Sequence, residues 1–295
     1  MAKKRKPIWL RILLWVISSI LSIVALLGVG CGILYIRYEI NVFKVIGQIR
    51  ILNEEVDYTQ IVNNPYTEAD LESAKLVTDA NVSGLISYTE QDGYSITPEK
   101  VTTSILGEVK LTDKQVAAII NNLIMSQDEI LIEFGTQVNL KEHGFKLEQV
   151  TFSEIDEGKT EFNVVLKIEL TKFKEDMNKF PANWIRKGIP DSLYFSATVD
   201  ILKGDGAFEY STQGKSLRIN NLTNEKTKNI FDTINVLTDF GTVEDFSKTI
   251  CDVFVNALIG NEATPGIAYA LTGVGAEDFD FEKEDTSTYF VIKMQ

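Results

Sequence analysis

The chain has 295 residues, 44% of them hydrophobic, and its 42 Asp and Glu residues outnumber its 29 Lys and Arg residues to give a formal charge of −13. A surface of this sign repels phosphate backbones, so nucleic acid is not expected as a partner. One histidine and two cysteines exclude a multi-histidine zinc site and a disulfide framework. We therefore expect neither a metal nor another cofactor.

The N-terminus combines a basic tail with a long apolar run. Residues 1–11 carry five basic side chains and no acid, and residues 12–36 carry no charge. A helix over the second range would be roughly 37 Å long, enough to span a hydrocarbon core of about 30 Å. Because basic residues stay on the cytoplasmic side, the sequence predicts a cytoplasmic tail over 1–11, a transmembrane helix over 12–36 and an extracytoplasmic remainder.

A cysteine near the end of this run, in LLGVGCGILY, raises a second way to anchor the chain. A lipid-modified cysteine follows a Leu-like residue by three positions, but Gly28 stands there, and the apolar run continues to Ile36. A cleaved secretory signal would have a shorter apolar core and a polar start to the mature chain. We interpret Cys31 as an interior residue of the span, with a lipoprotein or a cleaved signal as the alternative.

Charge is unevenly divided along the chain. Six of the 29 Lys and Arg residues and none of the 42 Asp and Glu residues lie at or before Arg37, so the rest of the chain has a formal charge of −19. That part contains Cys251 alone, without a disulfide partner. Secreted eukaryotic domains of this size more often carry disulfides. We therefore expect the cell envelope of a bacterium, most consistent with a Gram-positive one.

The region after the span divides into a stalk and a domain. Apolar residues at helical spacing in 41–56 predict that a helix continues outward, as an amphipathic stalk over 37–65. Residues 66–295 are enough for an extracytoplasmic α+β domain. Residues 67–79 are its first candidate helix.

The clearest element of the domain is the helix predicted by LTDKQVAAIINNLI. Thr112 can cap its N-terminus, with Gln115 three residues later as the reciprocal partner of a capping box. Leu111 before the cap can pack against Val116 as a hydrophobic staple.

Strand patterns dominate the middle of the chain. Residues 145–155 and 160–170 flank an acidic turn and predict a β-hairpin. Residues 193–202 alternate between apolar and polar and turn at Gly204–Gly206 into a second hairpin. Alternation over such lengths predicts an antiparallel sheet with one buried face.

Helical spacing returns over residues 223–237 and 243–258, and residues 286–293 again have the pattern of a strand. The predicted fold class is therefore α+β: one N-terminal transmembrane helix, then an extracytoplasmic domain of long curved antiparallel hairpins packed with helices on one side.

Candidates for catalysis or metal binding are few. His143, the only histidine, lies in KEHGF, which we interpret as an exposed turn rather than a general base or metal ligand. The acidic run 277–285 has carboxylates for calcium but lacks the spacing and central glycine of an EF-hand, so we interpret it as a solvated charged segment. No metal-ligand set and no catalytic residue is assigned.

The segment FPANWIRKGIP, residues 180–190, places aromatic residues near basic ones. Phe180, Trp184 and Ile185 are candidates for contact with a membrane surface, because basic charges beside a tryptophan suit a lipid headgroup. The alternative is a connection that tucks these side chains under the sheet.

The order of these features resembles a known family. A basic tail, one span, the capped helix LTDKQVAAIINNLI, long hairpins, a Pro-Trp connection and INNLTNEKTKNIFDTINVL follow one another. This arrangement resembles the YpmS-like uncharacterised Gram-positive membrane proteins and is loosely similar to tubular lipid-binding domains. The resemblance implies an apolar groove that holds acyl chains. The candidate groove residues lie on the inward faces of two predicted strands: Val164, Leu166, Ile168, Phe195, Ala197 and Val199.

Three functions follow from these patterns. The first is a non-catalytic, membrane-anchored envelope protein that binds membrane lipid or a lipid-linked molecule in this groove. The second is an accessory subunit that docks to another envelope protein. The third is a hydrolase that uses two carboxylates, for which no pair is singled out by the sequence.

Overall fold

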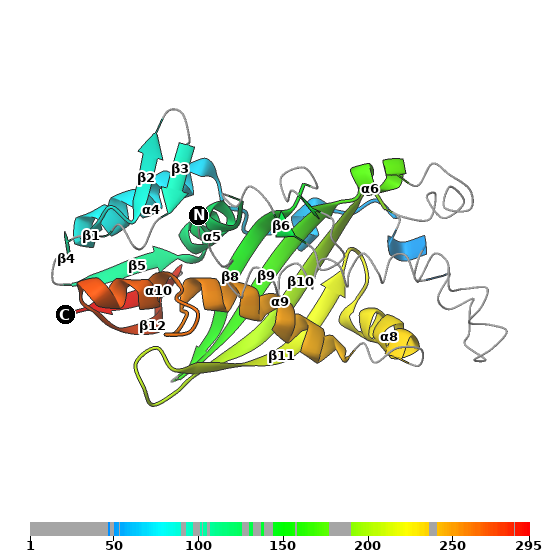
Figure 1. Ribbon diagram of the computed structural model, residues 1–295. Helices are drawn as coiled ribbons and strands as arrows, with labels where there is room; N and C mark the ends of the chain where they lie inside the picture. The colour runs from blue at the N-terminus through cyan, green and yellow to red at the C-terminus, as the bar shows by residue number, and fades with distance from the viewer. Residues whose placement is uncertain are drawn as a thin grey trace.

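A computed structural model of the chain (Figure 1) describes residues 47, 50–52, 54–89, 93–96, 101, 103–104, 107–125, 130–131, 137–138, 144–156, 158–176, 190–235, 241–285 and 287–295. The predicted span over 12–36 with Cys31, His143 and the candidate membrane contacts at 180–185 lie outside these residues. No helix within the described residues has the length and apolar composition needed to cross a membrane.

A four-stranded antiparallel sheet forms the centre of the described chain (Figure 1). Strands β8 (Lys146–Asp156) and β9 (Lys159–Glu169) form the first predicted hairpin, and β10 (Ser192–Lys203) and β11 (Tyr210–Ile219) form the second. The strand order is β11-β10-β9-β8, so β11 and β8 are the edges. Both hairpins and the mixed α+β class predicted from the sequence are confirmed.

Alternation of residue types decides which face of this sheet is buried. The odd-numbered residues of β10 from Leu193 to Ile201 are all buried, and those between them up to Thr198 are partly exposed. Helix α9 (Val243–Leu258) covers the resulting inner face and packs most extensively against β11 (Figure 1). Its own apolar stripe, which includes Phe254, completes the core.

Capping boxes set the starts of the two helices on this side of the sheet. In α9, the Asp245 N–H donates to Thr242 Oγ1 (3.1 Å) and the Thr242 N–H donates to the Asp245 carboxylate (3.0 Å). Helix α5 (Asp113–Met125) repeats this with the predicted residues, because the Gln115 N–H donates to Thr112 Oγ1 (3.3 Å) and the Thr112 N–H donates to Gln115 Oε1 (2.8 Å). The predicted helix and its capping box are confirmed.

A second, three-stranded antiparallel sheet has the order β12-β13-β5. It consists of β12 (Ala276–Glu284), β13 (Ser287–Met294) and β5 (Glu108–Thr112). The interpretation of 277–285 as a merely solvated charged segment is wrong. Phe279 and Phe281 alternate with the acids, are buried, and make most of the run a strand.

The acids of β12 alternate with these aromatic residues and bind lysines of the other two strands of the sheet. Asp280 Oδ2 is 2.9 Å from Lys293 Nζ, and Glu282 Oε2 is 2.7 Å from Lys110 Nζ. Within the described part of the chain, no group of three or more His, Cys, Asp or Glu side chains is placed to hold a metal ion.

The remaining elements are shorter or lie at the periphery. They are α3 (Tyr58–Ile61), α4 (Glu68–Asn81), β1 (Val82–Ser83), β2 (Ile86–Thr89), β3 (Gly93–Ile96), β4 (Thr103–Ser104), β6 (Ile130–Leu131), β7 (Gln137–Val138), α6 (Thr171–Asp176), α8 (Asn224–Asn235), α10 (Ile267–Ala270) and the 3-10 helix η2 (Leu271–Val274).

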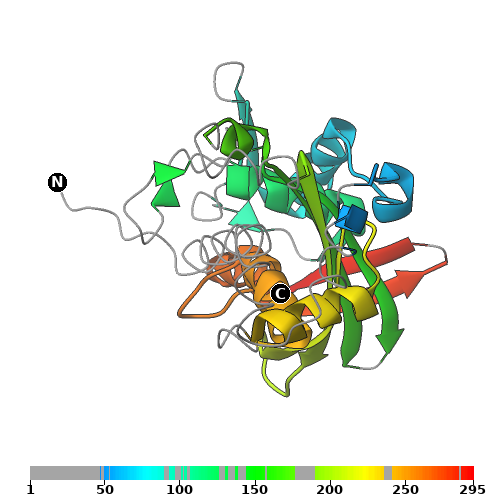
Figure 2. The same cartoon turned by 90° about the vertical axis from the view of Figure 1, so that its right-hand side faces the viewer.

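The end of the predicted stalk contacts the outer face of the four-stranded sheet, opposite α9 (Figure 2). The Tyr58 hydroxyl donates to Glu148 Oε2 (3.1 Å), and the Asn64 N–H donates to Gln149 Oε1 (2.8 Å). The Glu148 side chain is only 4% exposed, and its Oε2 also lies 2.7 Å from Lys146 Nζ. These contacts fix residues 58–64 on the sheet.

Candidate functional site

The six candidate groove residues come together, as the sequence predicts, but they lie in the core. The register pairs Val164 with Ala197 and Leu166 with Phe195. All six side chains belong to the buried core cluster, and none is more than 3% exposed. The two hollows described below are lined by none of them. This face is therefore occupied by packing in the described structure.

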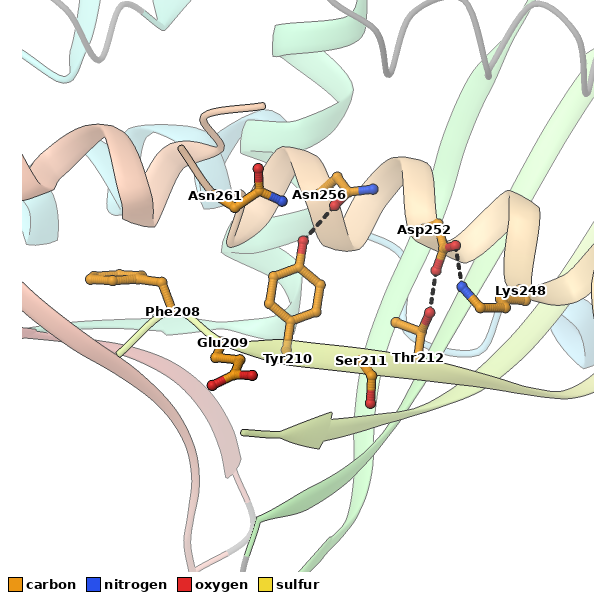
Figure 3. A pocket seen from close by; sticks show the side chains of 9 residues that line it. All are labelled: Phe208, Glu209, Tyr210, Ser211, Thr212, Lys248, Asp252, Asn256 and Asn261. Atoms are coloured by element: carbon orange, nitrogen blue, oxygen red, sulfur yellow. Dashed lines mark hydrogen bonds and ion pairs between the residues drawn. The ribbon is translucent and has the colours of Figure 1, made fainter. Parts of the chain in front are cut away.

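A polar hollow of about 380 Å³ lies at the edge of the sheet, between β11 and α9 (Figure 3). It was not predicted from the sequence. Its lining residues come from the turn before β11, from β11, from α9 and from the turn after α9: Phe208, Glu209, Tyr210, Ser211, Thr212, Lys248, Asp252, Asn256 and Asn261.

Helical and strand periodicities bring the polar groups of the hollow together. Lys248, Asp252 and Asn256 are spaced four residues apart, which places them along one flank of α9. On β11, Tyr210 and Thr212 point toward α9, whereas the intervening Ser211 points away (Figure 3). The hollow thus forms where a polar helix flank faces one side of an edge strand.

Glycine allows α9 to approach the strand at one end of this contact. A Cβ atom on Gly214 would lie 1.9 Å from the carbonyl oxygen of Glu244 in the first turn of α9. Any other residue would therefore separate the helix from β11. This close approach fixes the register in which the polar side chains of α9 meet those of the strand.

Hydrogen bonds hold the walls of the hollow in place (Figure 3). The Tyr210 hydroxyl donates to Asn256 Oδ1 (2.5 Å). Asp252 accepts a hydrogen bond from the Thr212 hydroxyl on one oxygen and binds Lys248 Nζ (2.5 Å) with the other. Burial, and then the negative charge of Asp252, raise the pKa of Tyr210 to about 12.

Two turns shape the same end of the hollow (Figure 3). Phe208 has a left-handed conformation (φ 57°) and packs edge-on against Tyr269, with ring centroids 5.7 Å apart. Asn261 Oδ1 accepts hydrogen bonds from the N–H groups of Ala263 and Thr264, both at 3.0 Å. Both turns therefore have defined conformations beside the hollow.

The chemistry of the hollow suits binding better than proton transfer. General acid–base catalysis is most efficient when a group has a pKa near the operating pH. Tyr210 stays protonated at neutral pH, and both oxygens of Asp252 already have donors. No histidine or cysteine lines the hollow.

A second hollow, of about 500 Å³, lies at the turn ends of the two hairpins beside β12. The lysine in its lining, Lys203, already has partners, because its Nζ binds Asp278 Oδ2 (2.7 Å) and the main-chain oxygen of Phe279 (2.5 Å). The lining residues are Ile155, Asp156, Gly158, Lys203, Gly204, Asp280 and Phe281. The lysine contacts join the large sheet to β12.

Comparison with known proteins adds no relative. No protein-family model matches the chain, and neither a curated protein nor a solved structure matches it.

Proposed function

We propose that this chain is a membrane-anchored, non-catalytic interaction module of the cell envelope, which docks to another envelope protein through the hollow between β11 and α9. The observation that carries the proposal is the contrast between the two candidate surfaces. The predicted apolar groove is a packed core face, whereas the β11–α9 hollow is open, polar and held by defined hydrogen bonds. An accessory subunit needs such a shaped surface and no reactive group.

The uneven charge of the sequence supports the same proposal. The part of the chain after Arg37 has a formal charge of −19, which disfavours anionic surfaces and favours a partner with a basic docking segment. The predicted span over 12–36 would hold the domain at the membrane, where a weak docking surface gains effective concentration. The resemblance to YpmS-like proteins remains a prediction beside this argument.

The lipid-binding function predicted from the sequence would require a different state of the domain. Acyl chains would have to enter between side chains such as Val164 and Phe195, which are at most 1% exposed. The hydrolase alternative would require two uncommitted carboxylates in a cleft. In the β11–α9 hollow, Asp252 already binds Thr212 and Lys248.

The test is purification of the full-length chain from native membranes in a mild detergent, followed by native mass spectrometry. Lys248→Trp fills the hollow, and Lys228→Trp, at an exposed position of α8, is the matched control. A stoichiometric protein partner that is lost with Lys248→Trp and kept with Lys228→Trp supports the proposal. A lipid-sized mass in place of a protein, or a partner unaffected by Lys248→Trp, contradicts it.

A further inference from the structure

Strand β11 has a free edge whose hydrogen-bonding direction can be worked out from its neighbours. Gly204 N donates across the hairpin to Glu209 O (2.8 Å), toward β11. The preceding residue, Lys203, donates its N–H to Gly158 O (2.9 Å), away from β11. In an antiparallel pair, successive residues alternate between bonding their partner and pointing away from it. The main-chain groups of Tyr210 and Thr212 therefore point out of the sheet.

The far end of this edge is closed by features that prevent strand addition. The outward N–H of Leu217 donates to Asn224 Oδ1 (3.0 Å). The register shifts opposite Thr198, which leaves Lys215 as an extra residue, and Gly214 lies against the first turn of α9. Bulges, lysines and covering elements are the usual means of protecting an edge strand.

The near end of the edge has no such protection among the described residues. At Tyr210 and Thr212 the side chains turn toward α9, and no described main-chain or side-chain group bonds the outward main-chain groups. This open stretch coincides with the polar hollow, which offers room for a side chain beside the strand. An added strand would gain main-chain hydrogen bonds and place alternate side chains toward the hollow.

The negative charge around the open stretch favours a basic partner. Glu209 and Asp252 line the hollow, and the exposed Asp205 and Glu262 lie in the two turns at one end of it. Lys248, the only cation in the lining, is already bound to Asp252. Because Lys248 offsets the charge of Asp252, the carboxylates that an incoming basic side chain would meet are those of Asp205, Glu209 and Glu262.

We infer that the Tyr210–Thr212 edge of β11 binds an extended peptide segment with Lys or Arg at alternate positions, which adds to the sheet as a further strand. This inference rests on the proposed function, because it specifies how the docking partner is held. The partner's main chain pairs with the outward groups of β11. One basic side chain lies at the mouth of the hollow, beside Glu209 and the two turns that carry Asp205 and Glu262.

The test uses the full-length chain and two defined peptide libraries of equal length, one with Lys or Arg at alternate positions and one with Glu at those positions. Thr212→Pro removes the outward N–H, whereas the matched Thr212→Val removes only the hydroxyl bond to Asp252 and keeps the N–H. We expect the basic library to bind and the acidic one not to. Thr212→Pro should weaken the selected peptides by about tenfold or more, and Thr212→Val by about threefold at most.

Each other result overturns the inference in a distinct way. Equal losses with both variants would show that the side chains of the hollow recognise the ligand without strand addition. Equal binding of both libraries, or of neither, would remove the argument from charge. If Lys248→Trp releases the native partner while Thr212→Pro does not, the edge inference fails and the proposed docking function stands. Far-UV circular dichroism of each variant checks that the sheet remains folded.

Discussion

The contact between Gly214 and α9 gives a prediction whose size follows from one distance. Replacing Gly214 with alanine would place Cβ 1.9 Å from the Glu244 oxygen and 2.6 Å from its carbonyl carbon, whereas ordinary van der Waals contacts begin at 3.4 Å. The obstacle is main chain and cannot rotate away, so the first turn of α9 must move. Overpacking typically costs 1–3 kcal/mol, and we expect about 3 kcal/mol here.

The assay is urea unfolding of the detergent-solubilised full-length chain, followed by far-UV circular dichroism. Gly273→Ala is the matched control, because a Cβ there has no atom within 4 Å, and we expect it to change stability by less than about 0.5 kcal/mol. If Gly214→Ala unfolds at the same urea concentration as Gly273→Ala, the close approach of α9 to β11 is wrong, and with it the geometry of the hollow.

Three further predictions concern groups away from this contact. Asn220→Ala should lower the free energy of unfolding by about 2–3 kcal/mol in the same urea assay. The reason is that Asn220, which is 2% exposed, donates to Leu52 O (3.0 Å) and accepts from the Tyr194 N–H (2.7 Å). A loss below about 0.5 kcal/mol would contradict these two hydrogen bonds. Burial alone would raise the pKa of Asp280, but hydrogen bonds from Lys293 and the Phe281 N–H hold this pKa below its usual 3.8. The stabilisation that Asp280 contributes is therefore present above pH 3.8 and is lost as the pH falls through the lowered pKa. Asp280→Asn should reduce the loss of unfolding free energy that is measured as the pH falls below this value. Tyr210 stabilises the fold below its unfolded pKa of 10, and this stabilisation is lost as the pH rises toward about 12. Tyr210→Phe should therefore reduce the loss of unfolding free energy measured between these two pH values. An unchanged dependence of the unfolding free energy on pH would contradict the raised pKa.

Local sequence signals predicted the elements that depend on neighbouring residues. Thr112 and Gln115 form the capping box that their spacing indicates, because its two hydrogen bonds lie within one helical turn. The alternation in β10 likewise predicted its buried face, since strand geometry sends successive side chains to opposite sides. These features need no knowledge of the rest of the chain.

Features set by distant segments were not predicted. Periodicity identified Val164 and Phe195 as facing the same side, but it gave no information on whether a cavity or a helix such as α9 would cover them. The β11–α9 hollow brings together side chains far apart in the sequence, including Tyr210 and Asn256, which are 46 residues apart. The polar spacing of Lys248, Asp252 and Asn256 was a usable signal, but it is equally typical of a solvated helix face.

The most direct test of the account is native mass spectrometry of the full-length chain purified from its own membrane, compared with Lys248→Trp. We expect a protein partner in stoichiometric amount with the natural chain, and its loss when the hollow is filled. A lipid-sized mass bound equally to both chains would contradict docking through the hollow and support an open sheet that holds acyl chains.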